Sequence, residues 1–199
     1  MKPKLKGRQH YDEKYIKVNG KDHYDLNCID HKTKYITAHL FVEKRTFPKC
    51  VEFLRQIKIT CYDQILERYK QKKKVIFVSD MFGNYKGAFN KLFLHVAILH
   101  FGVPIKAKVG GLKHNNNPIE RYNGDIKDRI KIMRGEFRDF EKAEAFLNLK
   151  RIIHNFVNPH LSLGEKTPAE VAEINLELGQ NKLLELIKKR AQKSHHSLR

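Results

Sequence analysis

The chain has 199 residues, and its 40 Lys and Arg against 22 Asp and Glu give a formal net charge of +18. A hydrophobic fraction of 41% with 12 Phe and 8 Tyr excludes a disordered chain and is enough for one domain with a core. Three cysteines with no CxxC pair support neither a disulfide framework nor a cysteine-based zinc site. The positive excess favours nucleic acid as a partner, because neutralising phosphates relieves self-repulsion and releases counterions.

The sequence shows no pattern typical of a membrane protein. No stretch approaches the roughly 20 apolar residues of a membrane span, and no apolar run near the N-terminus resembles a signal peptide. We therefore expect a cytoplasmic protein without membrane contact. Residues 1–9 are basic and contain no acid, which predicts a flexible arm.

The N-terminal third predicts a three-stranded antiparallel meander. The run Tyr11–Val18 is β-like, and Asn19-Gly20 follows it with the strongest two-residue hairpin signal, because both positions tolerate a positive φ. Further strands are predicted at residues 23–30 and 35–42.

A long helix and a buried strand are predicted next. Thr46 offers an N-cap, and apolar residues then recur near the helical period to Tyr69, with a possible break around Thr60. The run Val75–Asp80 is continuously apolar and ends in an acid, as a buried parallel strand does when helices flank it.

The rest of the chain alternates between strand and helix signals. A helix over residues 85–95 and a short strand near Ile105–Val109 are predicted, followed by a glycine- and asparagine-rich loop. Helices then begin at Pro118 and at Asp139, and Thr167 reads as an N-cap with Pro168 in the first helical position. This order predicts an α/β fold with a mixed sheet.

In a chain this basic, the acids at strand ends and helix starts are the informative ones. Asp12 lies in the first strand, Asp80 closes the buried strand, and Glu120 lies in the first turn of a helix. If the first and fourth strands are parallel neighbours, Asp12 and Asp80 converge and Glu120 approaches from the flanking helix. Carboxylates are the ligands that Mg²⁺ prefers, and two metal ions about 3.5–4 Å apart act on a phosphodiester.

Each acid also has a structural alternative. Asp12 is adjacent to Glu13, and either could be a solvated acid on a half-exposed strand. Asp30 is a rival to Asp12 but precedes a turn, where Asp commonly accepts bonds from its own backbone. Glu120 could complete a capping box with Asn117 as the N-cap, and both roles remain open at this point.

Four segments together resemble a known family: DEKYIKVNGK, VSD, NNNPIERYNGDIKDRI and NPHLSLGEKTPAE. They cover about residues 10–175 and resemble the catalytic domain of insertion-sequence transposases of the DDE type, in the retroviral-integrase superfamily. The acids are spaced by 68 residues from Asp12 to Asp80 and by 40 from Asp80 to Glu120, as in such enzymes.

The resemblance implies an RNase H-like fold, in which a five-stranded mixed sheet with its first three strands antiparallel is flanked by helices. It implies DNA transposition by Mg²⁺-dependent phosphodiester cleavage and strand transfer. By motif match, Asp12, Asp80 and Glu120 are the catalytic ligands of two Mg²⁺ ions, for which Mn²⁺ can substitute. A homo-oligomer is expected because transposition brings two DNA ends together.

Basic residues near Glu120 predict a track for the DNA backbone. Lys127, Lys131 and Arg134 follow Glu120 at helical spacing, and Lys113 precedes it in the loop together with the neutral Asn116, which could also reach the substrate. The alternative is a solvated face that Asp125 and Asp128 partly neutralise. The late NPHLSLGEKTPAE stretch is interpreted as packing and capping.

The predicted organisation is an arm at residues 1–9, a catalytic domain at residues 10–175 and a C-terminal helix with a basic tail at residues 176–199. Related transposases carry a helix-turn-helix domain before the first catalytic strand, whereas eleven residues precede Asp12 here. We therefore expect salt-sensitive DNA binding that is largely independent of sequence. Two alternative functions remain: a non-catalytic nucleic-acid-binding remnant and an RNase H-like nuclease.

Overall fold

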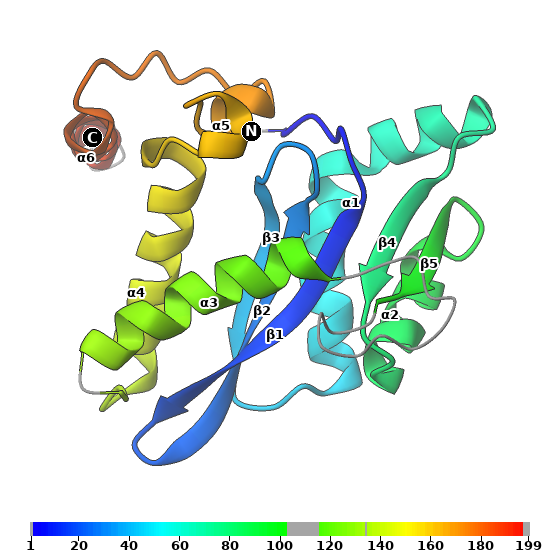
Figure 1. Cartoon of the computed structure of the whole chain (residues 1–199), viewed down its shortest axis with the longest axis horizontal. Helices are drawn as coiled ribbons and strands as arrows, with labels where there is room; N and C mark the ends of the chain where they lie inside the picture. Colours follow the sequence, from blue (N-terminus) through cyan, green and yellow to red (C-terminus); the bar gives the residue numbers. More distant parts are fainter. Residues whose placement is uncertain (1, 103–115, 134, 197–199) are drawn as a thin grey trace.

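The computed structural model describes residues 2–102, 116–133 and 135–196, which are arranged around a five-stranded sheet (Figure 1). The strand order across the sheet is β3-β2-β1-β4-β5. The strands are β1 (Gln9–Val18), β2 (Lys21–Asp30), β3 (Ile36–Val42), β4 (Val75–Ser79) and β5 (Ala97–Phe101).

The sheet is mixed, as the sequence predicts. β1, β2 and β3 pair antiparallel, and Asn19 and Gly20 join the first two with φ angles of +48° and +72°. The prediction of an Asn-Gly hairpin is therefore confirmed. β1 pairs parallel with β4, and β4 pairs parallel with β5. The first and fourth strands are thus the parallel neighbours on which convergence of the acids depends.

One element prediction lies outside the described residues, and another differs from the structure. The fifth strand is Ala97–Phe101, and the strand predicted at residues 105–109 lies outside the described residues. Apolar residues continue from the preceding helix into this strand with His95 as the interruption, which hides the boundary between the two elements. The break expected at Thr60 is wrong, because the Thr60 hydroxyl donates to the Gln56 carbonyl at 2.8 Å and fits within a continuous helix.

Helices cover both faces of the sheet (Figure 1). On one face, α1 (Phe47–Lys70) and α2 (Gly83–Phe93) bury a core that includes Phe53, Ile57 and Phe89. On the other face, α3 (Asn117–Ile132) and α4 (Phe140–Ile152) enclose a second core. Its members include Ile16, Ile119, Ile126 and Leu147. The sheet therefore separates two hydrophobic layers, with β1 at its centre.

Short helical segments follow α4. A π-helical turn, η1 (Ile153–Val157), continues α4, and a 3₁₀ turn, η2 (Leu161–Leu163), comes after it. Then come α5 (Pro168–Val171) and α6 (Lys182–His196). At the start of α5, the Thr167 side chain accepts from the Glu170 N–H while Glu170 accepts from the Thr167 N–H, so the predicted N-cap is confirmed. No helix among the described residues is long and apolar enough to cross a membrane.

The basic arm is not free, and the expectation of flexibility for residues 1–9 is wrong over its described part. Leu5 is 2% exposed and packs in the core beneath α1, and its N–H donates to the Gln64 side chain at 2.9 Å. The Lys4 N–H donates to the Ala172 carbonyl at 2.9 Å. Apolar residues between the lysines give the arm an inward face, and Gln9 is already part of β1.

Asp30 is confirmed as a turn former rather than a site acid. It is fully buried at the end of β2, and its Oδ1 accepts from the N–H groups of Lys32 and Thr33, both at 2.9 Å. Its Oδ2 accepts from the N–H groups of Lys6 and Gly7 and from Gln9 Nε2. Both carboxylate oxygens are therefore engaged in holding the turn and the N-terminal arm.

Candidate active site

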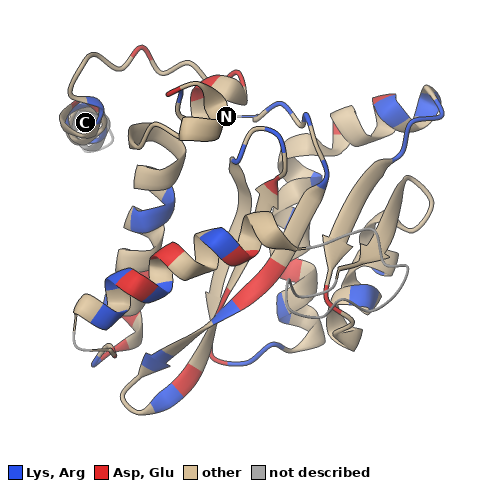
Figure 2. Ribbon diagram, viewed as in Figure 1, with Lys and Arg blue, Asp and Glu red and all other residues tan. Residues whose placement is uncertain are grey.

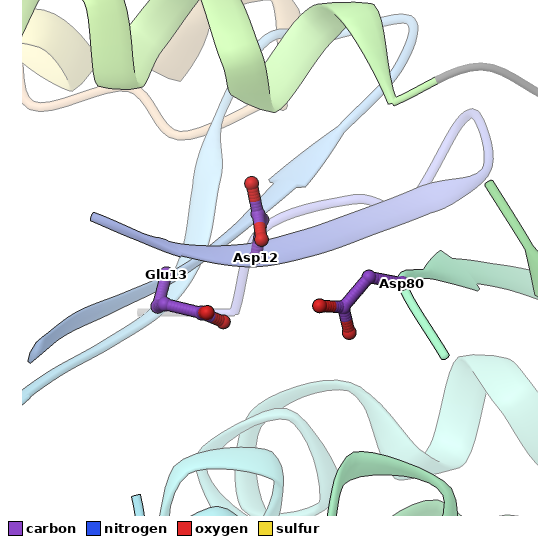
Figure 3. A group of neighbouring side chains, drawn as sticks. All are labelled: Asp12, Glu13 and Asp80. Atoms are coloured by element: carbon purple, nitrogen blue, oxygen red, sulfur yellow. The ribbon is translucent and has the colours of Figure 1, made fainter. Parts of the chain in front are cut away.

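Asp12 and Asp80 meet where β1 runs beside the end of β4. Asp80 directly follows the last residue of β4, and Asp12 lies within β1 just beyond the residues that pair with that strand. Together with Glu13, they form a group in which one carboxylate oxygen from each residue lies within 4.8 Å of the others (Figure 3). The predicted convergence of Asp12 and Asp80 is thus present in the structure.

Asp12 and Glu13 project from opposite sides of β1, because successive side chains of a strand alternate (Figure 3). Asp12 is on the side of α3, with Ile16 further along the same face, whereas Glu13 is on the side of α1 and α2, with Tyr11. Asp80 stands at the strand edge between the two faces. Both neighbouring carboxylates can therefore approach it.

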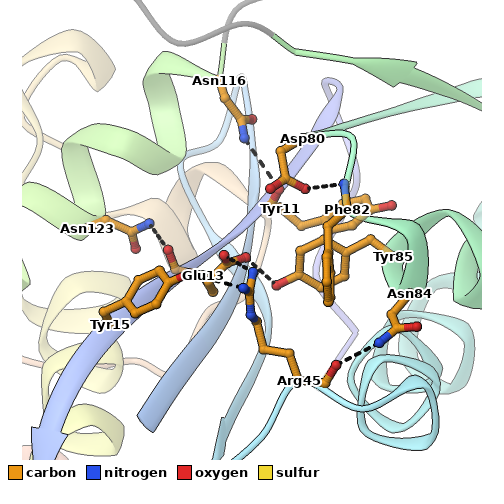
Figure 4. Close-up of polar contacts among 10 residues, drawn as sticks. All are labelled: Tyr11, Glu13, Tyr15, Arg45, Asp80, Phe82, Asn84, Tyr85, Asn116 and Asn123. Atoms are coloured by element: carbon orange, nitrogen blue, oxygen red, sulfur yellow. Dashed lines mark hydrogen bonds and ion pairs between the residues drawn. The ribbon is translucent and has the colours of Figure 1, made fainter. Parts of the chain in front are cut away.

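Glu13 is paired on its side of the sheet. Its Oε1 forms an ion pair with Arg45, and its Oε2 accepts from the Tyr85 hydroxyl at 2.9 Å (Figure 4). The Arg45 guanidinium lies over the rings of Tyr24 and Phe82, at 4.8 and 4.3 Å from their centroids. These aromatic faces hold the cation in place, so the charge of Glu13 has a fixed counter-charge.

Asp12 is in a different environment. Its pKa is raised from 3.8 to about 7, first because burial penalises the charged form and then because Glu13, Asp80 and Glu120 add negative charge nearby. A divalent cation would supply the counter-charge that this position needs. The donor set also fits such an ion, since carboxylate oxygens are the preferred ligands of Mg²⁺.

A local turn orients Asp80. Its Oδ1 accepts from the Phe82 N–H at 3.0 Å, which fixes the carboxylate where the chain leaves β4 for α2. An acid that ends an apolar strand must face a cleft or be paired, and here it faces two other carboxylates (Figure 3).

Two asparagines anchor α3 across Asp12. Asn116 Nδ2 donates to the Tyr11 carbonyl and Asn123 Nδ2 to the Glu13 carbonyl, both at 3.4 Å (Figure 4). These are the two carbonyls that flank Asp12 in β1. Asn116 is 5% exposed, so its placement favours a positioning role over the DNA contact that the sequence predicts.

Glu120 lies in the first turn of α3 and is half-buried. The N-cap of α3 is Asn116, which makes Glu120 the fourth helical residue rather than the third. The alternative of a capping box with Asn117 is therefore wrong. Glu120 is outside the group of oxygens within 4.8 Å, but it is close enough that its charge raises the pKa of Asp12.

Basic residues lie beside the acids. Lys127 and Lys131 are exposed on α3, along which Figure 2 shows basic positions alternating with acidic ones. Lys14, two residues from Asp12 on the same face of β1, has a pKa lowered by burial and then by the positive charge of Lys127. The predicted contacts of Arg134 and Lys113 concern residues outside the described ones.

Three neighbours of the acids were not predicted. Glu13 was considered only as a possible solvated acid beside Asp12, although strand alternation gives the two residues different surroundings. Lys14 could have been found from its spacing of two from Asp12. Arg45 had no local signal, because it reaches Glu13 only through tertiary folding.

Comparison with known proteins gives a consistent result. A family model described as a DDE domain matches residues 7–160. No curated protein matches the chain. The structure is similar to a chain of the simian T-cell lymphotropic virus intasome, solved in complex with PP2A regulatory subunit B56 gamma, with a TM-score of 0.58 and 10% identity. The similarity covers 88% of this chain and 59% of that one, so this chain spans less than two thirds of its length.

The structure is also similar to the HTLV-2 integrase catalytic core domain, solved in complex with magnesium. The TM-score is 0.50 at 12% identity, and the similarity covers 86% of this chain and 99% of that chain. At such identities the likeness concerns the fold. It confirms the predicted RNase H-like architecture, with a five-stranded mixed sheet flanked by helices.

Proposed function

Because this chain belongs to the DDE domain family, we propose that it is a transposase catalytic core that cuts DNA strands and joins them to a target. The observation that carries the proposal is the meeting of Asp12 and Asp80 at the edge of two parallel strands. Asp12, Asp80 and Glu120 would hold two Mg²⁺ ions, for which Mn²⁺ can substitute. Lys127 and Lys131 would bind the DNA backbone.

The proposed reaction has two steps at phosphorus. In the first, a water oxygen attacks a phosphodiester, the bond from phosphorus to the 3′ oxygen breaks, and a 3′-hydroxyl and a 5′-phosphate result. In the second, that 3′-hydroxyl attacks a phosphodiester of the target, and a target 3′ oxygen leaves. Bound Mg²⁺ supplies positive charge that polarises the phosphodiester and lowers the pKa of the attacking oxygen. No covalent bond to the protein forms.

The residues of the chain position the reactants. Asp80 is held by the turn at Phe82, and α3 is fixed across Asp12 by Asn116 and Asn123, so Glu120 has a defined approach. Lys14 and Lys127 place positive charge beside the acids, where a strand of DNA would lie. A homo-oligomer on DNA is part of the proposal, since two DNA ends are joined in one event.

The test is strand transfer by the whole chain, using short duplexes with a free 3′ end, a supercoiled plasmid and Mg²⁺ or Mn²⁺. Asp80→Asn should lower the rate by about 10³-fold, since several kcal/mol of transition-state stabilisation is lost with the metal. Asp22→Asn, which removes an exposed carboxylate from β2, is the matched control and should leave the rate unchanged.

A second readout does not depend on turnover. Mn²⁺ should raise the melting temperature of the parent chain and of Asp22→Asn, but not that of Asp80→Asn, because binding to the folded state alone stabilises it. Strand transfer that survives Asp80→Asn would show the assignment to be wrong. Cleavage of RNA–DNA hybrids without joining would instead support the RNase H-like nuclease.

A further inference from the structure

A pocket of about 460 Å³ opens on the flank of α3 away from the acids. Segments distant in the sequence form its walls: the turn between β2 and β3, the first turns of α3, the start of η1 and the NPHLSLGEKTPAE stretch. The residues that carry the argument are Lys34, Arg121, Tyr122, His154 and His160. This volume is within the roughly 300–1,000 Å³ of small-molecule sites and exceeds the needs of a single small ion.

The charged groups of the pocket are mostly cationic. Lys34, from the turn after β2, and Arg121, from α3, both line it, and Asp125 is the acid among its described lining residues. The two cations are close enough that Arg121 contributes to lowering the pKa of Lys34, after the larger effect of burial. Both also contribute, again after burial, to the lowered pKa of His160. A positive field of this kind attracts an anion.

The walls are held firmly. His154 Nε2 lies 2.8 Å from the Lys34 carbonyl oxygen, and the His154 ring meets that of Tyr122 edge to face at 4.9 Å between centroids. His160 Nδ1 lies 3.0 Å from the Ser162 hydroxyl. The pocket is therefore preorganised rather than assembled from free side chains.

Two lining residues contain buried polar atoms that have no hydrogen-bond partner among the described residues. These atoms are the hydroxyl oxygen of Tyr122 and the side-chain oxygen of Asn117. Both atoms have almost no accessible surface, so they belong to the wall behind the pocket and are not counted among the contacts to an occupant. Apolar surface lies beside them, since Ile29, Pro118 and Pro159 also line the pocket.

We propose that this pocket binds one phosphate-bearing nucleotide of DNA, with Lys34 and Arg121 on the phosphate and the base against the proline-lined wall. The inference rests on the proposed function for the identity of the nucleic acid. It gives the NPHLSLGEKTPAE stretch a role in binding, beyond the packing and capping that the sequence suggests. The nucleotide lies on the opposite flank of α3 from Glu120, so the strand would cross the helix between the two sites.

The pocket is tested first with deoxyadenosine monophosphate, inorganic phosphate and deoxyadenosine as probes. Binding is followed by NMR on the imidazole signals of His154 and His160, without Mg²⁺, with exposed His95 beside β5 as the internal reference. We expect the monophosphate to shift both pocket histidines and leave His95 unmoved, with weaker shifts from inorganic phosphate and none from deoxyadenosine. Unmoved pocket histidines at saturating monophosphate would overturn the proposal.

Two variants tie the effect to the named cations. Lys34→Gln and Arg121→Gln should each abolish the monophosphate shifts. Their controls are Lys32→Gln, in the same turn, and Arg129→Gln, on the same helix; both remove an exposed cation that does not line the pocket. Each pocket variant should also reduce the salt dependence of DNA binding by about one phosphate contact. Controls that lose the shifts equally would overturn the assignment.

Because these measurements contain no Mg²⁺, their failure is distinguishable from failure of the proposed function. Monophosphate binding without strand transfer would support the pocket proposal and contradict the transposase proposal. Strand transfer without monophosphate binding would support the transposase proposal and contradict the pocket proposal.

Discussion

The two faces of β1 differ sharply at adjacent residues. Glu13 has an ion pair with Arg45 and a hydrogen bond from Tyr85, whereas Asp12 is half-buried among other negative charges. Glu13 thus has an ion-pair partner within the protein, although burial still raises its pKa, whereas Asp12 lies among further carboxylates. The difference teaches that acids that lie close together can have different electrostatic surroundings, so closeness alone does not give them the same role.

The largest effect expected from this comparison is on catalysis. Asp12→Asn should lower strand transfer by about 10³-fold, as expected for loss of a metal ligand. Glu13→Gln should lower it by less than about 10-fold, since Arg45 and Tyr85 already engage that carboxylate. Rates are compared at saturating DNA and Mg²⁺. Equal losses in the two variants would remove the distinction between the faces.

The pH dependence of stability should differ between the parent chain and Asp12→Asn. The folded-state pKa of about 7 is above the ordinary 3.8, so between these values the folded state holds a proton that the unfolded state has lost. Stability from this group is complete below pH 4 and is lost as pH rises through 7. The difference in unfolding free energy between the two proteins should fall by up to about 1.4 kcal/mol per pH unit in that window.

Urea unfolding in a metal-free buffer measures this difference. Subtracting the Asp12→Asn curve removes the contribution of the histidines to the pH dependence. His10 is one of these: its folded-state pKa is about 4, below the ordinary value, so its contribution to stability increases as pH rises. Asp22→Asn supplies the control for removing a carboxylate from an exposed position. A difference curve that is flat or rises from pH 4 to 7 would contradict a raised pKa at Asp12.

Removing the cation from the other face should destabilise the fold. Arg45→Met leaves the buried Glu13 charge without its ion-pair partner, and a loss of about 3 kcal/mol is expected. The double variant Arg45→Met with Glu13→Gln should regain much of that loss, because no unpaired charge remains. Thermal unfolding of the four proteins completes the cycle, and additive effects would mean that the pair is not coupled.

The sequence predicted much of the fold because local signals agree with the tertiary structure. Asn19-Gly20 makes the hairpin and Thr167 caps α5 for reasons that lie within a few residues. Asp80 was predicted as a site residue because an acid at the end of a buried apolar strand must face a cleft or be paired, and this pattern is visible in the sequence. The prediction of a flexible N-terminal arm was wrong, because the contact of Leu5 with α1 depends on a residue about 60 positions away in the sequence.

The candidate site was only partly predictable for the same reason. Asp12 and Asp80 follow from strand topology, but the pairing of Glu13 needs Arg45 and Tyr85, which are brought together by α1 and α2. The flank of α3 was interpreted as a solvated face or a DNA track. Its pocket forms because the NPHLSLGEKTPAE stretch lies near the turn at Lys34, and no local sequence pattern predicts that tertiary contact.

The smallest expected effect concerns the Tyr85 hydroxyl. Tyr85→Phe removes its hydrogen bond to Glu13 while keeping the ring that packs against Tyr11 at 5.2 Å between centroids. Because the acceptor is charged, we expect a loss of about 1.5 kcal/mol in unfolding free energy. In the background of Glu13→Gln the same change should have a smaller effect, because the acceptor is then neutral. Strand transfer should stay within about 3-fold of the parent rate, and a much larger fall would place this face in the catalytic machinery.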